Sequence, residues 1–308
     1  MRRQNDYVSP IDRIAQKIIA KLEEGTMPWK RSWDQTGFRA PLRWNGAPYN
    51  GINYFTLMMA SEESGYSSPY WMTYKKAQEL GGQVRKGEHA SHAIFYKSYT
   101  PGQRDTAGGD EEDPAQRRVA KCYTVFNADQ IDNLPQSFHP APAPLRDNSS
   151  ELQPIVEAIT AATGARIEHH GNRAYYAPGP DMVVMPPLPQ FHDYEAYAAT
   201  LMHELIHWTS AVTRLDRQLG KRFGDEAYAA EELIAELGAA RLGDAIGLPA
   251  SHIENHAAYI GSWIKVLRSD PRAILTAAAK ADAAARYIYP DIDGVKTVAD
   301  DDEEREAA

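Results

Sequence analysis

Two histidines and a glutamate lie within five residues of one another in the segment LMHELIHW, residues 201–208. In a helix, a spacing of four residues places His203 and His207 about one turn apart on the same face, so both imidazoles can reach a single metal ion. Glu204 is rotated by about 100° from His203, so it lies beside the ion without having to bind it. The H-E-x-x-H pattern therefore predicts a zinc-type site with Glu204 as general base toward a water that the ion makes acidic. The alternative is an amphipathic helix that presents two histidines and binds no metal.

A catalytic site of this kind needs a third protein ligand and one position left open for water. The best donors lie in YAAEELIAELGAA, residues 228–240, within the next predicted helix. Glu232 and Glu236 are four residues apart and share a face, whereas Glu231 points about 100° away. We expect Glu232 to be the third metal ligand and Glu236 to orient a histidine through its free ring N–H. This set of ligands suits Zn²⁺, although Mn²⁺ or another divalent ion can occupy it; the alternative is that these glutamates face solvent.

Aromatic and basic side chains alternate between residues 29 and 86. Rings that stack on bases, set among cations that neutralise phosphates, are what sequence-tolerant binding of single-stranded DNA requires. The alternative, which composition alone favours, is a small domain that uses its aromatic residues as core. The residues that we expect to contact DNA are Trp29, Arg31, Arg39, Arg43, Trp44, Tyr49, Asn53, Lys75, Arg85 and Lys86.

The metal motif belongs to a predicted small sheet followed by helices. A helix at about 151–163 precedes three strand candidates, ARIEHH, RAYYAP and DMVVMP. A small sheet that leads into a helical region is an α+β arrangement. We expect an extended peptide to add to the strand at residues 181–185 by β-augmentation. The helices predicted after this strand lie at about 193–212, 225–246, 254–268 and 271–287.

The first half of the chain is predicted to mix helices with strands. SPIDRIAQKIIAKLEEG reads as an amphipathic helix capped by Ser9, and a second helix is predicted from Tyr74 to Leu80. The strand-like runs at 93–99 and 119–127 flank a polar, glycine-rich loop at 101–116, so we expect a hairpin there. The rest of this half reads as turns and strands.

A proline-rich segment, PQSFHPAPAPLRDNSS, separates the two halves and predicts a linker. We expect a first domain at residues 1–135, a linker at 136–150, a second domain at 151–295 and an acidic tail at 296–308. The net charge of −9 is concentrated after residue 150, because the residues before it are close to neutral. A polyanionic partner would therefore bind the first half.

Composition limits the class of protein. With 308 residues, 43% of them hydrophobic and 24% charged, the chain is typical of a folded globular protein. No run of about eighteen apolar residues is available to cross a membrane, and the N-terminus does not resemble a secretory signal. Cys122 is the single cysteine, which excludes an intramolecular disulfide and a cysteine metal cage. We expect a reducing, cytoplasmic location.

Four segments in the first half occur in a recognisable order: PW, PYNGINYFTL, YWMTYKKAQELGGQVRKGEHA and YTVFNADQIDNLP. Together they resemble the N-terminal domain of the ArdC-type antirestriction proteins, which also occurs in some plasmid-encoded primases. HELIHWTS followed by YAAEELIAELGAA likewise resembles the metallopeptidase-like domain of that family. The resemblance extends over about residues 8–290. One departure is Asn50, where the pattern has a basic residue.

This resemblance implies an α+β protein in which a mixed α/β domain that binds single-stranded DNA precedes a mainly helical, zincin-like domain with a small sheet. It implies a protein of a conjugative plasmid or other mobile element that shields incoming DNA from host restriction. A zinc-dependent peptidase of this kind would act on a host protein related to restriction. The rival hypothesis is a non-catalytic protein that coats single-stranded DNA and holds a structural or vestigial metal. A nuclease fits less well, since one ion without a carboxylate cluster does not suit two-metal phosphodiester cleavage.

Overall fold

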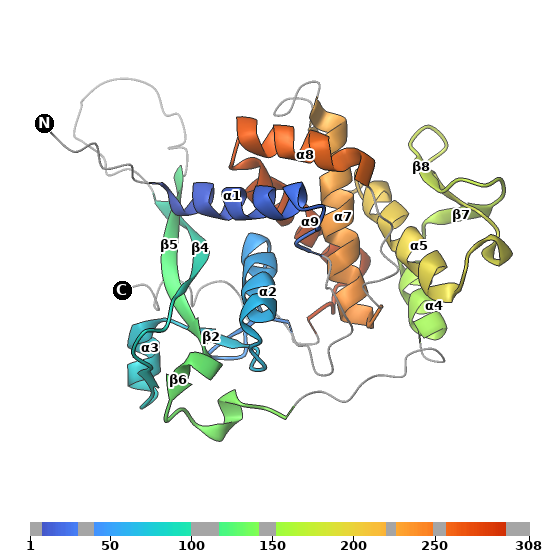
Figure 1. The fold of residues 1–308 in the computed structure, drawn as a ribbon. Helices are drawn as coiled ribbons and strands as arrows, with labels where there is room; N and C mark the ends of the chain where they lie inside the picture. Colours follow the sequence, from blue (N-terminus) through green and yellow to red (C-terminus); the bar gives the residue numbers. More distant parts are fainter. Residues whose placement is uncertain are drawn as a thin grey trace, which may run out of the picture.

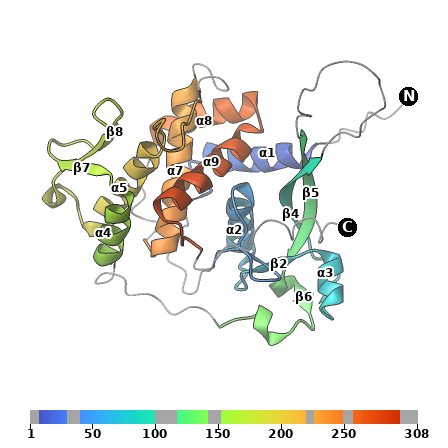
Figure 2. The ribbon, with the colours of Figure 1, turned by 180° about the vertical axis from the view of Figure 1, so that it is seen from behind.

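The computed structural model describes residues 8–29, 40–99, 117–141, 152–219, 226–248 and 257–293. Figures 1 and 2 show a hairpin and short helices at one end of the molecule and a group of long helices with a small sheet at the other. The predicted α+β class, with a mixed first half and a mainly helical second half, is confirmed. Among the described helices, none combines the length and apolar character that a membrane span requires.

The first half is built on a four-stranded sheet whose strand order is β1-β2-β5-β4. Its predicted hairpin is present: β4 and β5 are antiparallel, with Ser91 opposite Val125 at one end and Tyr99 opposite Arg117 at the other. A two-stranded sheet of β3 and β6 lies beside it. The strands are β1 (Leu42–Arg43), β2 (Tyr70–Met72), β3 (Gln83–Val84), β4 (Ser91–Tyr99), β5 (Arg117–Asn127) and β6 (Ile131–Asp132).

Both helices predicted in this half form. Helix α1 (Pro10–Glu23) begins where the Ser9 hydroxyl accepts a hydrogen bond from the backbone N–H of Asp12 at 3.1 Å. Helix α3 (Tyr74–Glu79) begins in the same way at Thr73. A side chain at the N-cap satisfies one of the free N–H groups of the first turn, which is why these sequences start helices.

Helix α2 (Ile52–Ser64) was not predicted, because we expected turns and strands there. Its buried residues are spread over nearly the whole circumference, from Ile52 to Met59, so the sequence shows no polar face and no helical period. A helix that is apolar on all sides is recognised only from its surroundings. Here the surroundings are strand β4 on one side and helix α9 (Ala273–Ile288) on another.

The second half contains a three-stranded sheet of order β7-β9-β8, followed by long helices. Strand β9 pairs in parallel with β7 and in antiparallel with β8, so it is the central strand. The elements are α4 (Leu152–Thr163), β7 (Arg166–His169), β8 (Tyr175–Ala177), β9 (Met182–Met185), α5 (Tyr194–Trp208), α7 (Ala227–Ile246), α8 (Ala257–Ser269) and α9. Short 3-10 turns, η1 (Ala128–Gln130), η2 (Gln136–Phe138) and η3 (Leu188–Gln190), complete the list.

The largest apolar core extends across both halves. Helix α1 packs on α8, and the ring of Trp29, in the segment that follows α1, meets the ring of Trp263 in α8 edge to face with centroids 5.6 Å apart. The guanidinium of Arg241 in α7 lies over the ring of Tyr54 in α2, 4.4 Å from its centroid. The division at residues 136–150 stays a prediction, and residues 142–150 and the tail at 296–308 lie outside the described residues.

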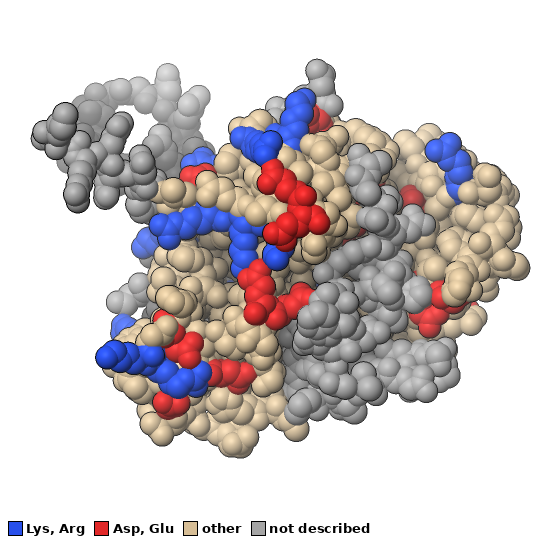
Figure 3. Space-filling model, viewed as in Figure 1, with Lys and Arg blue, Asp and Glu red and all other residues tan. Residues whose placement is uncertain are grey.

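Figure 3 shows basic side chains over α1, over α8 and over the end of the molecule that carries α3. Acidic side chains lie among them. On α1, Lys17 pairs with Glu63 of α2 at 2.5 Å. Exposed ion pairs of this kind add little to stability. The main effect of such surface charges is the electrostatic potential that an approaching ligand meets.

Asp129 joins the turns beneath the first sheet. Its carboxylate accepts hydrogen bonds from the backbone N–H groups of Ser67 and Ser68, at 2.6 and 3.0 Å, and lies 3.2 Å from Nδ1 of His139. Burial raises the pKa of Asp129, but the hydrogen bonds from Ser68 and Ser67 outweigh it and hold the pKa below its usual value. The ionised form therefore stabilises the fold.

We expect Asp129→Asn to lower the free energy of unfolding at pH 7 by about 1–3 kcal/mol, because a neutral amide replaces the charged carboxylate that accepts the backbone hydrogen bonds. A carboxyl group whose pKa is lower in the folded protein than in the unfolded chain stabilises the fold at pH values above its unfolded pKa, which is about 3.9. This contribution disappears as pH falls through the pKa of the folded state. The difference between wild type and variant should therefore shrink below about pH 4. Denaturant titrations at several pH values measure it, with Asp132→Asn, an exposed neighbour, as control. Equal stability at pH 7 would contradict the prediction.

Candidate metal centre

Helix α5 presents the histidines of the motif toward α7. The helix begins at Asp193, whose side chain accepts a hydrogen bond from the backbone N–H of Ala196 at 2.8 Å. From residue 198 onward its side chains are buried almost without interruption, so the helix is fixed on all sides. His203 and His207 therefore have little freedom to turn away from one another, and their ring centroids lie 4.8 Å apart.

Helix α7 approaches α5 closely because of a glycine. A Cβ atom on Gly238 would lie only 2.7 Å from Cδ1 of Ile206 in α5, a distance that real Cβ contacts essentially never show. The absent side chain lets the two helix backbones come together. Glu232 lies earlier in the same helix and is carried into contact with the histidines.

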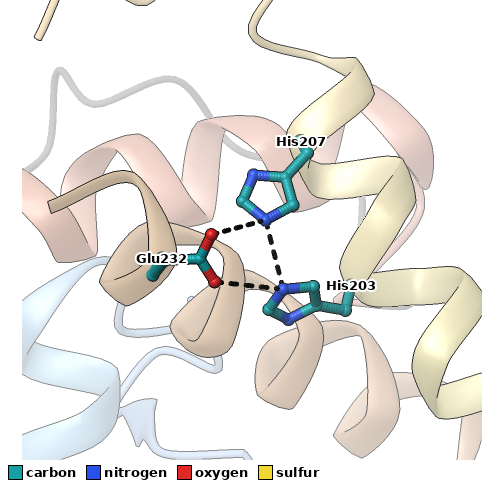
Figure 4. A group of neighbouring side chains, drawn as sticks. All are labelled: His203, His207 and Glu232. Carbon is teal, nitrogen blue, oxygen red and sulfur yellow. Dashed lines mark hydrogen bonds and ion pairs between the residues drawn. The ribbon is translucent and has the colours of Figure 1, made fainter. Parts of the chain in front are cut away.

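The three predicted ligands converge, as Figure 4 shows. The Nε2 atoms of His203 and His207 are 3.1 Å apart, and the Glu232 carboxylate oxygens lie 3.7 Å from the first and 3.6 Å from the second. Donors about 2.0–2.1 Å from a tetrahedral ion are about 3.3–3.4 Å from one another. The arrangement therefore fits one divalent ion, and the donor set of two imidazoles and one carboxylate suits its chemistry.

Charges around the centre favour an ionised Glu232. Burial raises the pKa of Glu232, but the imidazoles of His203 and His207 outweigh it and lower the pKa below its usual value. The pKa of Glu204, which is 7% exposed, is instead raised because burial disfavours its charged form. One carboxylate is thus held as an anion beside the histidines, and the other is moved toward the range in which it can accept and release a proton.

Glu231 has a role that the sequence did not predict. We expected it to point away, but its Oε1 lies 3.2 Å from Nδ1 of His207. The buried guanidinium of Arg217 holds the same carboxylate through Nε at 3.0 Å and also reaches the backbone oxygen of Ile206 at 2.7 Å. Glu236, which we expected to orient a histidine, lies 3.9 Å from Nδ1 of His203, beyond hydrogen-bond distance. The carboxylate one residue before the third ligand was the available signal in the sequence.

We expect Glu231→Gln to weaken binding of Zn²⁺ by about 10- to 100-fold, the usual effect of removing a carboxylate that orients a ligand histidine. Titration against a competing chelator measures the change. Glu226→Gln is the matched control, because Glu226 precedes the same helix and pairs with the exposed Lys265. Unchanged metal affinity would show that Glu231 only neutralises Arg217.

The centre opens into a cleft of about 1010 Å³. Strand β8 forms one wall, and the hydroxyls of Tyr228 and Tyr259, 3.1 Å apart, lie at another. We expected a peptide to add to residues 181–185, but that expectation was wrong: residues 182–185 form β9, which is paired on both sides. The edge strand that lines the cleft is β8, through Tyr175 and Tyr176.

The predicted DNA-contacting residues separate by burial. Lys75, Arg85 and Lys86 are exposed, and Arg43 and Trp44 are partly buried beside them in the first half. Arg85 also pairs with its neighbours, at 2.7 Å from Glu88. All three side chains are exposed, and one of them, Arg85, is already paired with a carboxylate.

Three other predicted contacts lie in the interior. Trp29 and Tyr49 are each 3% exposed and pack in the core, so they cannot stack on a base. Asn53 is 7% exposed and ties α2 to β4 through two hydrogen bonds of 2.7 Å with the backbone of Ile94. An aromatic residue gives the same sequence pattern whether it forms a core or a binding surface, and here Trp29 and Tyr49 belong to the core. Arg31 and Arg39 lie outside the described residues.

Comparison with known proteins identifies both halves. Residues 9–126 match the family model for the N-terminal domain of the anti-restriction factor ArdC, and residues 154–280 match the zincin-like metallopeptidase model. Protein y4eC of Sinorhizobium fredii (strain NBRC 101917 / NGR234) is 38% identical over 283 residues, which cover 90% of this chain and 91% of that protein. DNA primase TraC of Escherichia coli is 38% identical over 294 residues, 90% of this chain but 27% of the primase.

Two solved structures are similar over nearly the whole chain. The metal-free crystal structure of the antirestriction ArdC protein from the R388 plasmid is 41% identical, with a TM-score of 0.76, and the match covers 93% of this chain and 98% of that one. The Mn(II)-bound structure of the same protein is 40% identical, with a TM-score of 0.75, covering 94% and 100%. Both halves, in the same order, are therefore shared, and the chain belongs to the ArdC-type antirestriction family, with a zincin-like second half.

Proposed function

We propose that this antirestriction protein is a zinc-dependent peptidase that also binds single-stranded DNA through its first half. The observation that carries the peptidase proposal is the convergence of His203, His207 and Glu232 at the floor of an open cleft, with Glu204 beside them. A structural metal site is normally closed by four protein ligands, whereas three ligands facing a cleft leave a position for water and substrate.

The chemistry follows from the position and charge of each side chain. His203, His207 and Glu232 would hold a divalent ion, which when bound would supply a Lewis acid for a peptide carbonyl and for a water. Glu204 would take a proton from the water whose oxygen bonds to the carbonyl carbon and would pass it to the amine nitrogen as the C–N bond breaks, a task suited to a carboxylate whose pKa is raised by burial. Glu231 holds the ring of His207 in place from behind. A peptide lies in extended form along the edge of β8.

DNA binding is proposed for the surface of α3 and β3, where Lys75, Arg85 and Lys86 are exposed. Support comes from the ArdC-type first half, which this chain shares with a protein named as a DNA primase. A host protein related to restriction is the proposed peptide substrate, and the cytoplasm of the recipient cell is the proposed place of action.

Salt dependence tests the DNA proposal. We expect the full chain to bind oligothymidine with an affinity that falls as salt rises, with a logarithmic slope of about −0.7 for each phosphate neutralised. Replacing Lys75, Arg85 and Lys86 together by glutamine should make that slope shallower by about 2. Fluorescence anisotropy at several salt concentrations measures it, and Lys265→Gln on α8 is the control. An unchanged slope would place the DNA elsewhere, and no binding by the wild type would reject the DNA proposal.

A further inference from the structure

A small aromatic pocket opens in the first half, between the sheet and α3. Its volume is about 40 Å³, room for about three water molecules. The rings of Tyr49, Phe95 and Tyr123 form part of its wall, and Trp44 and Trp71 also line it. This space is too small for a whole nucleotide and large enough for a few oxygen atoms of a larger molecule.

Two residues that line the pocket carry buried hydrogen-bond donors that lack an acceptor. The indole N–H groups of Trp44 and Trp71 are both buried, and neither has an acceptor among the residues that the structure describes. Trp71 is 0% exposed, so bulk water does not satisfy its N–H. Buried donors without a partner are costly, and a site with two of them favours a ligand rich in acceptors.

The charges at the pocket also favour a ligand that is an anion. The Arg43 guanidinium lies over the rings of Tyr49 and Phe95, 5.5 and 5.2 Å from their centroids. The Lys76 ammonium lies 4.3 Å from the ring centroid of Trp44 and pairs with Glu79 at 2.6 Å. Among the described residues that line the pocket, none carries a negative charge.

We propose that this pocket holds one phosphodiester group of single-stranded DNA, and this inference rests on the proposed DNA binding. A phosphodiester offers acceptors only and carries one negative charge, which matches two N–H donors and two cations. A nucleobase edge is a poorer match, because most base edges also carry donors that would find few acceptors here. The phosphate contact fixes the path of the strand, and adjacent bases remain free to stack.

Two neighbouring lysines give a matched test. Lys76→Gln removes a cation from the pocket, and Lys75→Gln makes the same change on the exposed side of the same helix. We expect Lys76→Gln to weaken binding of oligothymidine by about 10- to 100-fold, and Lys75→Gln by about 2- to 3-fold. Trp44→Phe, which keeps a ring and deletes the N–H, should weaken binding by about 3- to 10-fold. Thermal melts of each variant confirm that the fold is retained.

The indole N–H signals in ¹H–¹⁵N spectra report on the pocket directly, with Trp44→Phe and Trp71→Phe to assign them. Both signals should shift downfield when oligothymidine is added to the full chain. If the wild type binds oligothymidine while both signals stay in place and Lys76→Gln binds as Lys75→Gln does, the pocket assignment is overturned and the DNA proposal stands. If inorganic phosphate moves the signals and oligothymidine does not, the pocket takes a free anion and the assignment is equally overturned. If the wild type binds no DNA, both proposals fall.

Discussion

His203→Ala is expected to abolish stable binding of a divalent ion. The change removes one of three protein ligands, so the loss of Zn²⁺ affinity should exceed the about 100-fold that follows when only an orienting group is removed. Metal analysis of the purified protein should fall from one equivalent to none. A second measurement does not depend on activity: at a free metal concentration of 100 times Kd, the wild type should gain about 2.7 kcal/mol of stability and the variant almost nothing.

His170→Ala is the matched control for this prediction, because His170 is an exposed histidine in the same half that lies near Glu168 rather than near the ligands. It should retain one equivalent of metal and the full gain in stability. If His203→Ala also retained one equivalent, the ion would be bound elsewhere, and the peptidase proposal would lose its basis.

Glu204→Gln is expected to lower peptide hydrolysis by about 10²- to 10⁴-fold, the usual contribution of a general base. The amide has nearly the same shape as the carboxylate but cannot accept the proton. Metal content and DNA affinity should stay as in the wild type, because Glu204 is not among the three converging ligands. Turnover of a fluorogenic peptide library measures the effect, with Glu195→Gln in the first turn of the same helix as control.

The same variant separates the peptidase from a protein that only coats DNA. Protection of transferred DNA against restriction should be lost with Glu204→Gln if hydrolysis produces the protection. Protection that survives in Glu204→Gln and in His203→Ala would favour the rival hypothesis, in which the first half coats the DNA and the metal site is structural or vestigial. Hydrolysis that persists in Glu204→Gln would instead show that another group takes the proton.

Residue spacing within single helices was enough to predict most of the metal site and the starts of two helices from the sequence. The two histidines share a helix turn, and Glu232 and Glu236 share a face of the next helix, because the helical period fixes those relations before any tertiary contact forms. Ser9 and Thr73 marked the starts of α1 and α3 for the same reason, since capping is a contact between residues close in sequence.

The contacts between elements that are distant in the sequence were decided only by the tertiary structure. Glu231 reaches His207 only because α7 lies close against α5 at Gly238 and because Arg217 folds back onto that carboxylate. Strand order put β8 at the edge and β9 in the middle, which no property of either strand alone specifies. Trp29 was drawn into a core shared with α8. Periodicity describes one element at a time, whereas burial and charge pairing are set by the partners that packing brings from distant parts of the chain.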